Sequence, residues 1–306
     1  MFGRFCDSYR NKKVYVMGHE RADFDTLVSA YLMSRWLSRC GVDAEPVMPD
    51  TAPAPDDVPQ SVMLWHGVDV SGWTRATSLG ADSGVLFLVD CHTPCIPLSV
   101  AAVIDHHPTS EPIPVPEEYC VDRAASSCAL LAYRIAKADG IDITDDEEIL
   151  TVRSVYMDTQ SLLSAKFDPA DKPWLEAMIK KHRLDAGDLQ HRGLCFADLS
   201  RRPEELALDW LKYYTIAGKK CASSHIQAEN IPDAIIDGAV RFLTDRRRAE
   251  GIDIWIFFVA EPLAGKSRVI ELSDSGVSER RYERFLSRSK DIIPELERRL
   301  SQGLDF

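Results

Sequence analysis

Three short apolar runs in the first part of the chain each end at residues that can bind a metal ion. The runs are residues 14–17, 85–89 and 102–104, and they are followed by Gly18-His19, Asp90 and Asp105-His106-His107 respectively. Short apolar runs bounded by polar turn residues predict buried strands. In a parallel sheet, ligands gather beyond the carboxyl ends of the strands, so these side chains are expected to converge on one site.

Longer amphipathic stretches separate these runs. Residues 26–39 and 127–138 have the spacing of apolar positions that predicts helices, and residues 63–65 predict a further strand. Strands that alternate with helices indicate an α/β domain, in which helices flank a mostly parallel sheet.

The second part of the chain has a different character. Residues 191–203 are polar and irregular, residues 231–248 predict a helix, and residues 252–260 and 267–271 predict strands. A chain of 306 residues also exceeds the size at which one core usually stops growing. We therefore predict a first domain over 1–190, a linker over 191–203 and a smaller α+β domain over 204–306.

Composition narrows the classes of protein. Hydrophobic residues make up 45% of the chain and charged residues 27%, as in ordinary globular proteins. The formal net charge of −12 disfavours tight binding to a long nucleic acid, although a local basic pocket could accept a small phosphate compound. No apolar stretch reaches the roughly 20 residues that a membrane-spanning helix needs. Without an apolar signal-peptide core at the N-terminus, we expect a cytoplasmic protein with reduced cysteines.

A first candidate metal cluster lies between the first predicted strand and the helix of residues 26–39. His19, Asp23 and Asp25 fall on one short turn there and could face a single point. Imidazole nitrogen and carboxylate oxygen suit manganese, cobalt, magnesium or iron better than metals that prefer thiolates. The alternative is structural, because either aspartate could cap the helix.

Further acids and histidines follow other predicted elements. These residues are Asp90, His106, His107 and Asp158, the last of which follows the apolar residues 152–157. Each has an ordinary explanation alone, as a turn residue or a surface histidine. Together they gather carboxylates that would repel one another unless cations neutralise them. The set predicts a pair of divalent metal ions.

The motifs resemble the four ordered motifs of the DHH phosphoesterases. The matching segments are Gly18-His19 with Asp23 and Asp25, Val89-Asp90, Ile104-Asp105-His106-His107 and Met157-Asp158-Thr159. The most similar branch contains the family II inorganic pyrophosphatases and the prune-type exopolyphosphatases, whose second domain is called DHHA2. His19 favours the pyrophosphatases, because the exopolyphosphatases tend to carry asparagine there. Residues 287–294 also resemble the basic C-terminal signature of the pyrophosphatases.

The resemblance implies a ligand set for two divalent ions, with Mn²⁺ favoured and Co²⁺ or Mg²⁺ as alternatives. The first ion would be bound by His19, Asp23 and Asp90, and the second by Asp25, Asp90, His106 and Asp158. Asp90 would thus bridge the two ions. A water shared by two cations becomes hydroxide near neutral pH and can attack phosphorus in line.

The resemblance also implies residues that bind the substrate. His107 would contact the substrate or assist the leaving group, and Lys212 and Arg288 would hold phosphate oxygens. Lys290 completes the basic signature, and Arg21 adds a cation beside the metal ligands.

Two departures from the family pattern affect the expected substrate. Arg21-Ala22 replaces the usual Asn-Pro, and Ser289 replaces the first of two lysines in the C-terminal signature. Losing one charge-assisted contact costs about 1.5 to 3 kcal/mol of binding. These changes weaken strict pyrophosphatase specificity and leave every predicted metal ligand intact.

Three functional hypotheses follow from the sequence. The first is an enzyme that hydrolyses phosphoric anhydrides, with pyrophosphate as its substrate. The second is an exopolyphosphatase or a phosphodiesterase of short nucleotides. The third is a regulatory protein that binds a phosphate ligand without turnover, which a bridged metal pair disfavours. The resemblance suggests a homodimer.

Overall fold

The computed structural model describes residues 2–20, 22–50, 63–64, 66–107, 115–116, 119–164, 166–195 and 197–303. Contacts between Cα atoms divide the chain into two compact units, with the main boundary between Gly193 and Leu194. We call them the N-terminal unit and the C-terminal unit and describe each by itself. Their assignment as a catalytic and a substrate-binding domain stays a prediction.

The N-terminal unit is built on a six-stranded sheet in the order β3-β2-β1-β4-β5-β6, and every neighbouring pair is parallel. The strands are β1 (Lys13–Met17), β2 (Asp43–Met48), β3 (Thr74–Arg75), β4 (Val85–Val89), β5 (Ser99–Asp105) and β6 (Cys120–Asp122). The predicted α/β class with a mostly parallel sheet is confirmed. The strand predicted at 63–65 is wrong, because Met63 and Leu64 are helical and residue 65 lies outside the described residues.

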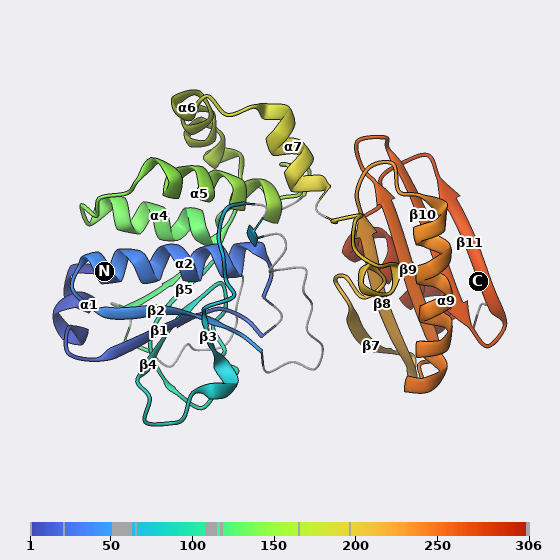
Figure 1. Cartoon of the computed structure of the whole chain (residues 1–306), viewed down its shortest axis with the longest axis horizontal. Helices are drawn as coiled ribbons and strands as arrows, with labels where there is room; N and C mark the ends of the chain where they lie inside the picture. Colours follow the sequence, from blue (N-terminus) through green and yellow to red (C-terminus); the bar gives the residue numbers. More distant parts are fainter. Residues whose placement is uncertain are drawn as a thin grey trace. The chain divides into compact units, whose positions relative to one another are not determined.

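Helices cover one face of this sheet. The helices of this part of the chain are α1 (Phe2–Tyr9), α2 (Phe24–Arg39), α4 (Cys128–Ala138), α5 (Asp145–Asp158), α6 (Lys172–His182) and α7 (Ala186–Leu194), of which α6 packs on α5 rather than on the sheet. Helix α2 contacts β1 and β2, α4 contacts β5, and α5 packs on α2 and α4 (Figure 1). Side chains on the other face, among them Met17, Leu86 and Leu88, pack against the segment of residues 91–98.

Local capping explains where the helices begin. The Asp23 side chain accepts a hydrogen bond from the Thr26 amide at the start of α2, and the Ser127 hydroxyl accepts one from Leu130 at the start of α4. Helix α5 begins with a capping box between Thr144 and Glu147. Each cap satisfies amide groups that the first helical turn leaves without partners.

A buried carboxylate ties α2 to the start of α5. The Glu147 side chain is 4% exposed and accepts hydrogen bonds from Arg39 at 2.6 and 2.8 Å and from Arg35 at 3.0 Å. Trp36 Nε1 donates a further bond at 3.2 Å. Burial would raise the pKa of Glu147, but the Arg39 guanidinium and the other donors outweigh it and lower the pKa to about 2.

The C-terminal unit is built on a mixed five-stranded sheet in the order β11-β10-β9-β8-β7. The strands are β7 (Lys212–Ile216), β8 (Lys219–Gln227), β9 (Ile254–Glu261), β10 (Lys266–Ser273) and β11 (Gly276–Tyr282). Only the β8–β9 pair of this sheet is parallel, and α9 (Asp233–Glu250) connects those two strands. The α+β class predicted for the second part of the chain is confirmed. The predicted helix and two strands correspond to α9, β9 and β10, with bounds close to the predicted ones.

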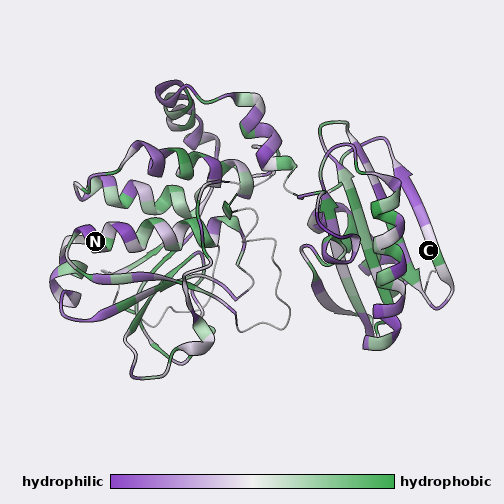
Figure 2. Ribbon diagram, viewed as in Figure 1, coloured by the Kyte–Doolittle hydropathy of each residue, from purple (hydrophilic) through white to green (hydrophobic). Residues whose placement is uncertain are grey.

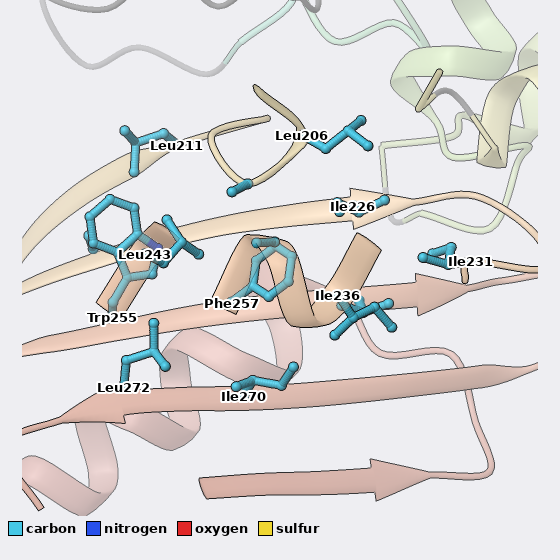
Figure 3. Close-up of a cluster of buried hydrophobic side chains, with 14 of the residues drawn as sticks. Leu206, Leu211, Ile226, Ile231, Ile236, Leu243, Trp255, Phe257, Ile270 and Leu272 are labelled. Atoms are coloured by element: carbon cyan, nitrogen blue, oxygen red, sulfur yellow. The ribbon is translucent and has the colours of Figure 1, made fainter. Parts of the chain in front are cut away.

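Both faces of this sheet are covered. Trp255, Phe257 and Leu272 pack with Leu243 of α9 on one face (Figure 3). On the other face, Ile256 and its neighbours pack with a single π-helical turn, η4 (Arg288–Ile292), and with α10 (Ile293–Ser301). The inner strand β9 is therefore hydrophobic, whereas the outer strand β11 is largely hydrophilic (Figure 2). A short helix, α8 (Pro203–Leu206), adds Leu206 to the first cluster.

Among the described residues, no helix has the length and apolar character that a membrane crossing requires.

We expect Glu147→Gln to destabilise the protein at pH 7 by on the order of 3 kcal/mol, because the native contacts stabilise the ionised carboxylate. The folded-state pKa lies below the ordinary value of 4.5, so this stabilisation is complete above about pH 4.5 and is lost as the pH falls toward about 2. Urea unfolding at several pH values measures it, with the exposed Glu176→Gln as control. A difference between wild type and variant that stays constant from pH 5 to pH 2 would contradict the prediction.

Candidate metal centre

The side chains of the candidate site come from the ends of five elements of the N-terminal unit. His19 follows β1, Asp90 follows β4 and His106 follows β5. Asp23 and Asp25 lie at the start of α2, and Asp158 is the last residue of α5. The carboxyl ends of neighbouring parallel strands meet at one edge of the sheet, which brings the first three residues together.

Three of these residues form one group that could hold a metal ion. His19, Asp23 and Asp90 each offer a ligand atom, and these atoms lie within 4.8 Å of one another. His19 Nε2 lies 3.8 Å from Asp23 Oδ2 and 3.6 Å from Asp90 Oδ2.

A second group of the same kind lies beside the first. Asp25, His106 and Asp158 also offer ligand atoms within 4.8 Å of one another. His106 Nε2 lies 3.7 Å from Asp25 Oδ2 and 3.7 Å from Asp158 Oδ2, and only 3.1 Å from Asp90 Oδ1. The two carboxylate oxygens of Asp90 therefore face different groups, and Asp90 connects them.

The backbone of Asp90 is unusual for a residue with a side chain. Its φ of +58° lies in the left-handed region, which costs on the order of 1 to 3 kcal/mol and persists only where surrounding contacts fix it. The Asp90 amide donates to the Ile104 carbonyl at 2.9 Å and to Cys128 Sγ at 3.2 Å. Thr26 Oγ1 donates to Asp90 Oδ2 at 2.6 Å. These contacts hold the carboxylate between the two groups.

Asp25 is held by helix α4 as well as by its own helix. Its carboxylate accepts hydrogen bonds from the amides of Cys128 at 2.6 Å and Ala129 at 3.1 Å, and from Ser154 Oγ at 2.5 Å. The amides belong to the first turn of α4, where helices favour negative charge. The carboxylate is 1% exposed, so its position is fixed.

The capping alternative holds for Asp23, whose Oδ1 accepts from the Thr26 amide at 3.0 Å. Its other oxygen, Oδ2, faces His19, so capping and metal binding are compatible. Asp158 has no such role. A carboxylate at the C-terminus of a helix opposes the helix dipole and needs positive charge nearby.

Several atoms of the site fit a bound divalent cation. Asp90 Oδ1, Asp158 Oδ2 and His106 Nε2 are buried and have no hydrogen-bond partner. His106 Nδ1 lies 2.9 Å from the Ala125 carbonyl oxygen, which can only accept, so Nδ1 carries a hydrogen and Nε2 is the nitrogen that faces the carboxylates and could bind a cation. Buried polar atoms of this kind ordinarily have partners, and oxygen and imidazole donors suit Mn²⁺ or Mg²⁺.

The electrostatics agree with that fit. Burial, together with the charges of Asp90 and Asp158, raises the pKa of Asp25 to about 7 against the opposing charge of His106. Burial would lower the pKa of His106, yet the facing carboxylate of Asp90 and the charges of Asp25 and Asp158 raise it to about 10. Both groups therefore hold a proton more tightly than usual, because the site attracts positive charge.

His107 is oriented by Asp105. His107 Nδ1 lies 2.9 Å from Asp105 Oδ1, and the His107 amide donates to the same oxygen at 3.0 Å. His92 Nδ1 lies 3.1 Å from the other oxygen. Burial would raise the pKa of Asp105, but the bonds from His107 and then His92 lower it to about 2. Hydrogen bonding to Asp105 is the main cause that raises the pKa of His107.

Sequence reasoning missed several residues that shape the site. They are Thr26, Cys128, Ser154 and Lys166, the last of which pairs with Asp158 at 2.5 Å. Asp105 is expected at the site as part of the Asp-His-His motif, but the sequence does not predict its role in orienting His107. The others come from helices and a loop whose approach to the site only the tertiary structure determines.

Two of the predicted phosphate-binding residues of the C-terminal unit, Arg288 and Lys212, lie near the buried His225. Burial and the charges of Arg288 and Lys212 lower the pKa of His225 well below its ordinary value. Arg288 donates to the Trp210 carbonyl and lies 3.5 Å from His225 Nδ1. Lys290 is exposed on η4. Arg21 lies outside the described residues, so its predicted role remains a prediction.

Residues 13–157 match the DHH family, N-terminal domain. The N-terminal unit is a DHH-family domain. The match includes every residue of the two groups except Asp158, which directly follows it.

Similarity to known proteins extends over both units. The probable manganese-dependent inorganic pyrophosphatase of Streptococcus thermophilus is 22% identical over 316 residues, which cover 93% of this chain and 97% of that protein. A protein of the same name from Lactobacillus helveticus is 20% identical over 317 residues and covers 93% and 98%.

Solved structures share the fold. A putative family II inorganic pyrophosphatase of Methanococcus jannaschii matches with a TM-score of 0.64 at 20% identity, over 94% of this chain and 99% of that one. An exopolyphosphatase-related protein of Bacteroides fragilis matches with a TM-score of 0.51 at 11% identity, over 98% and 96%. The resemblance to the DHH phosphoesterases is confirmed, and with it the expectation of a metal-dependent phosphohydrolase.

We expect Gly18→Ala to destabilise the protein and to displace the residues of the candidate metal centre. An added Cβ would lie 2.2 Å from Thr26 Cγ2 and 2.8 Å from the Val89 carbonyl oxygen, so β1, β4 and α2 would have to move apart. Overpacking of this kind costs about 1 to 3 kcal/mol, which urea unfolding measures. Mn²⁺ affinity should fall as well, because Thr26 fixes Asp90. Gly72→Ala, with no atom within 4 Å of its added Cβ, is the control, and equal stabilities of the two variants would sink the prediction.

Proposed function

We propose that this protein hydrolyses inorganic pyrophosphate to two phosphates with two divalent metal ions, most readily Mn²⁺. The observation that carries the proposal is the pair of ligand groups that Asp90 connects. One group would be His19, Asp23 and Asp90, and the other Asp25, Asp90, His106 and Asp158. These are the two ligand sets that the sequence predicts.

Divalent cations in such a site supply a Lewis acid and lower the pKa of a bound water. The protein's own residues have separate tasks. Asp25 and Asp90 are fixed by hydrogen bonds, so the ligand positions are set before any substrate arrives. His107 Nδ1 faces carboxylate oxygens of Asp105 and Asp90, which leaves Nε2 as the nitrogen that can hold a proton for a leaving phosphate.

The names of the relatives favour pyrophosphate. The curated relatives are called probable manganese-dependent inorganic pyrophosphatases, and they align over nearly their whole length. We assign to Lys212 and Arg288 the binding of phosphate oxygens, and to Lys290 and Arg21 a supporting role. A homodimer and a cytoplasmic location stay predictions.

Polyphosphates and short nucleotides are the second candidate substrates. Arg21-Ala22 and Ser289 depart from the pyrophosphatase pattern and change the charge that a substrate would meet. A panel of pyrophosphate, tripolyphosphate, long-chain polyphosphate and short oligonucleotides, each tested with Mn²⁺ and with Mg²⁺, ranks them by kcat/KM.

We expect chelator-stripped protein to release phosphate from pyrophosphate when Mn²⁺ is restored. Asp90→Asn should lower this activity by more than about a hundredfold. Replacing a residue that only supports a metal ligand typically costs roughly 10–100-fold, so the larger loss would indicate a direct ligand. Asparagine tolerates the left-handed backbone of position 90, so this variant removes the charge and keeps the fold. The exposed Asp82→Asn is the control. Mn²⁺-dependent hydrolysis that survives in Asp90→Asn would refute the bridging role.

We expect Lys212→Met to raise the KM for pyrophosphate by roughly tenfold or more, the cost of one charge-assisted contact. Mn²⁺ binding, measured by calorimetry without substrate, should not change, because Lys212 lies in the C-terminal unit and the ligand groups lie in the N-terminal unit. Exposed Lys266 lies in the same unit, and Lys266→Met serves as the control. An unchanged KM in Lys212→Met would remove this lysine from the substrate site.

A further inference from the structure

Lys166 extends a positive charge to the edge of the candidate metal centre. Its Nζ lies 2.5 Å from Asp158 Oδ1, while Asp158 Oδ2 faces His106 Nε2 at 3.7 Å. One oxygen of the Asp158 carboxylate therefore faces the Lys166 ammonium, and the other faces His106 of the second ligand group. Asp23 and Asp90 also attract this ammonium. Lys166 therefore borders both groups, although it lies outside the ligand set that the sequence predicts.

The segment that carries Lys166 is held in an uncommon conformation. After α5 ends, Gln160, Ser161 and Leu162 follow one another with φ values of +49°, +54° and +68°. Three successive left-handed residues other than glycine persist only where contacts fix them. Thr159 supplies two of these contacts, because its Oγ1 accepts from the Leu162 amide at 3.0 Å and its carbonyl accepts from the Ser164 amide at 2.9 Å.

Helix α7 supports the same segment from the other side. Ser161 Oγ donates to the Gln190 carbonyl at 2.9 Å. A Cβ on Gly193 would lie 2.5 Å from Ser161 Oγ and 2.8 Å from the Tyr156 carbonyl oxygen, so the helix and the segment are in close contact. The fold thus fixes the backbone of residues 159–164, whereas the Lys166 side chain is 43% exposed and can rotate about its four-carbon stem.

The chemistry of Asp158 makes its pairing with Lys166 conditional. A carboxylate that binds a divalent cation attracts an ammonium less, and the two positive charges repel each other. A cation held by Asp25, His106 and Asp158 would therefore weaken the pairing and free the ammonium. A lysine ammonium is a point charge that binds phosphate oxygens well, and the lysine stem can reach an anion that arrives beside the metal ions.

The geometry points to Lys166 as a further substrate-binding residue, which pairs with Asp158 until a divalent cation binds there and then binds a phosphoryl oxygen of the substrate. This inference rests on the proposed function for its second half only. The first half concerns Mn²⁺ and this chain alone, so it can be tested without any substrate.

The test compares Lys166→Met with wild type, and with Lys166→Arg and Lys172→Met as controls. Methionine keeps the apolar stem and removes the charge, arginine keeps the charge, and Lys172 is an exposed lysine of the same unit. Calorimetry with Mn²⁺ alone measures metal affinity, thermal unfolding verifies the fold, and steady-state kinetics on the best substrate of the panel measures KM and kcat.

We expect Lys166→Met to bind Mn²⁺ more tightly, by roughly threefold or more, because a competing charge is gone. Its KM should rise by roughly tenfold, because a charge-assisted contact to the substrate is lost. Lys166→Arg should stay near wild type in both, and Lys172→Met should change neither. A merely structural lysine would not move the two affinities in opposite directions.

Two results would each overturn one half of the inference, and a third would overturn the proposed function. Weaker or unchanged Mn²⁺ binding in Lys166→Met overturns the competition at Asp158. Tighter Mn²⁺ binding with an unchanged KM overturns the substrate contact. If wild type hydrolyses nothing in the panel, the proposed function fails, and calorimetry of pyrophosphate in the presence of Mn²⁺ then decides the contact by whether Lys166→Met binds it more weakly than wild type.

Discussion

Repulsion between carboxylates is the constraint on which the N-terminal unit depends. Asp25, Asp90 and Asp158 are almost fully buried, and their oxygens surround one imidazole nitrogen of His106 at 3.1 to 3.7 Å. Like charges at this spacing inside a protein are costly unless cations or hydrogen bonds oppose them. A chain that gathers such carboxylates must hold them in place with hydrogen bonds and packing. The resulting site attracts divalent cations.

Several features of the fold hold these carboxylates in place. Gly18 lets β1 and α2 approach each other, Cys128 and Thr26 hold Asp90 in a left-handed conformation, and the first turn of α4 binds the carboxylate of Asp25. Each feature has a conformational or packing cost, and each serves to position a carboxylate. Strain concentrated at one edge of an otherwise regular parallel sheet is characteristic of functional sites.

The C-terminal unit solves a different problem. Its inner strands alternate large side chains between two covered faces, so Trp255 and Phe257 pack under α9 while Ile256 and Phe258 pack under η4 and α10. The π-helical turn η4 also carries Arg288, which the Trp210 carbonyl and His225 orient. An imidazole that faces a guanidinium remains neutral, because a guanidinium only donates hydrogen bonds. Arg288 is thus oriented by contacts within the C-terminal unit itself.

The sequence by itself determined the class of fold, the order of the main elements and the residues that the structure brings together in the two candidate groups. An apolar run that is followed by Asp90, or by Asp105 and His106, indicates a buried strand and also shows which side chains lie at its carboxyl end. Both can be predicted because periodicity and strand direction are local properties. Local patterns failed at Met63 and Leu64, which are helical although the sequence predicts a strand there, and at the short edge strands β3 and β6, which carry too few residues to give a signal. Only the tertiary structure decided that the two oxygens of Asp90 face different groups, that Asp23 both caps α2 and faces His19, and that Lys166 reaches Asp158. Those relations join residues far apart in the chain, and the side-chain directions that create them are set by packing between helices and sheet rather than by sequence spacing.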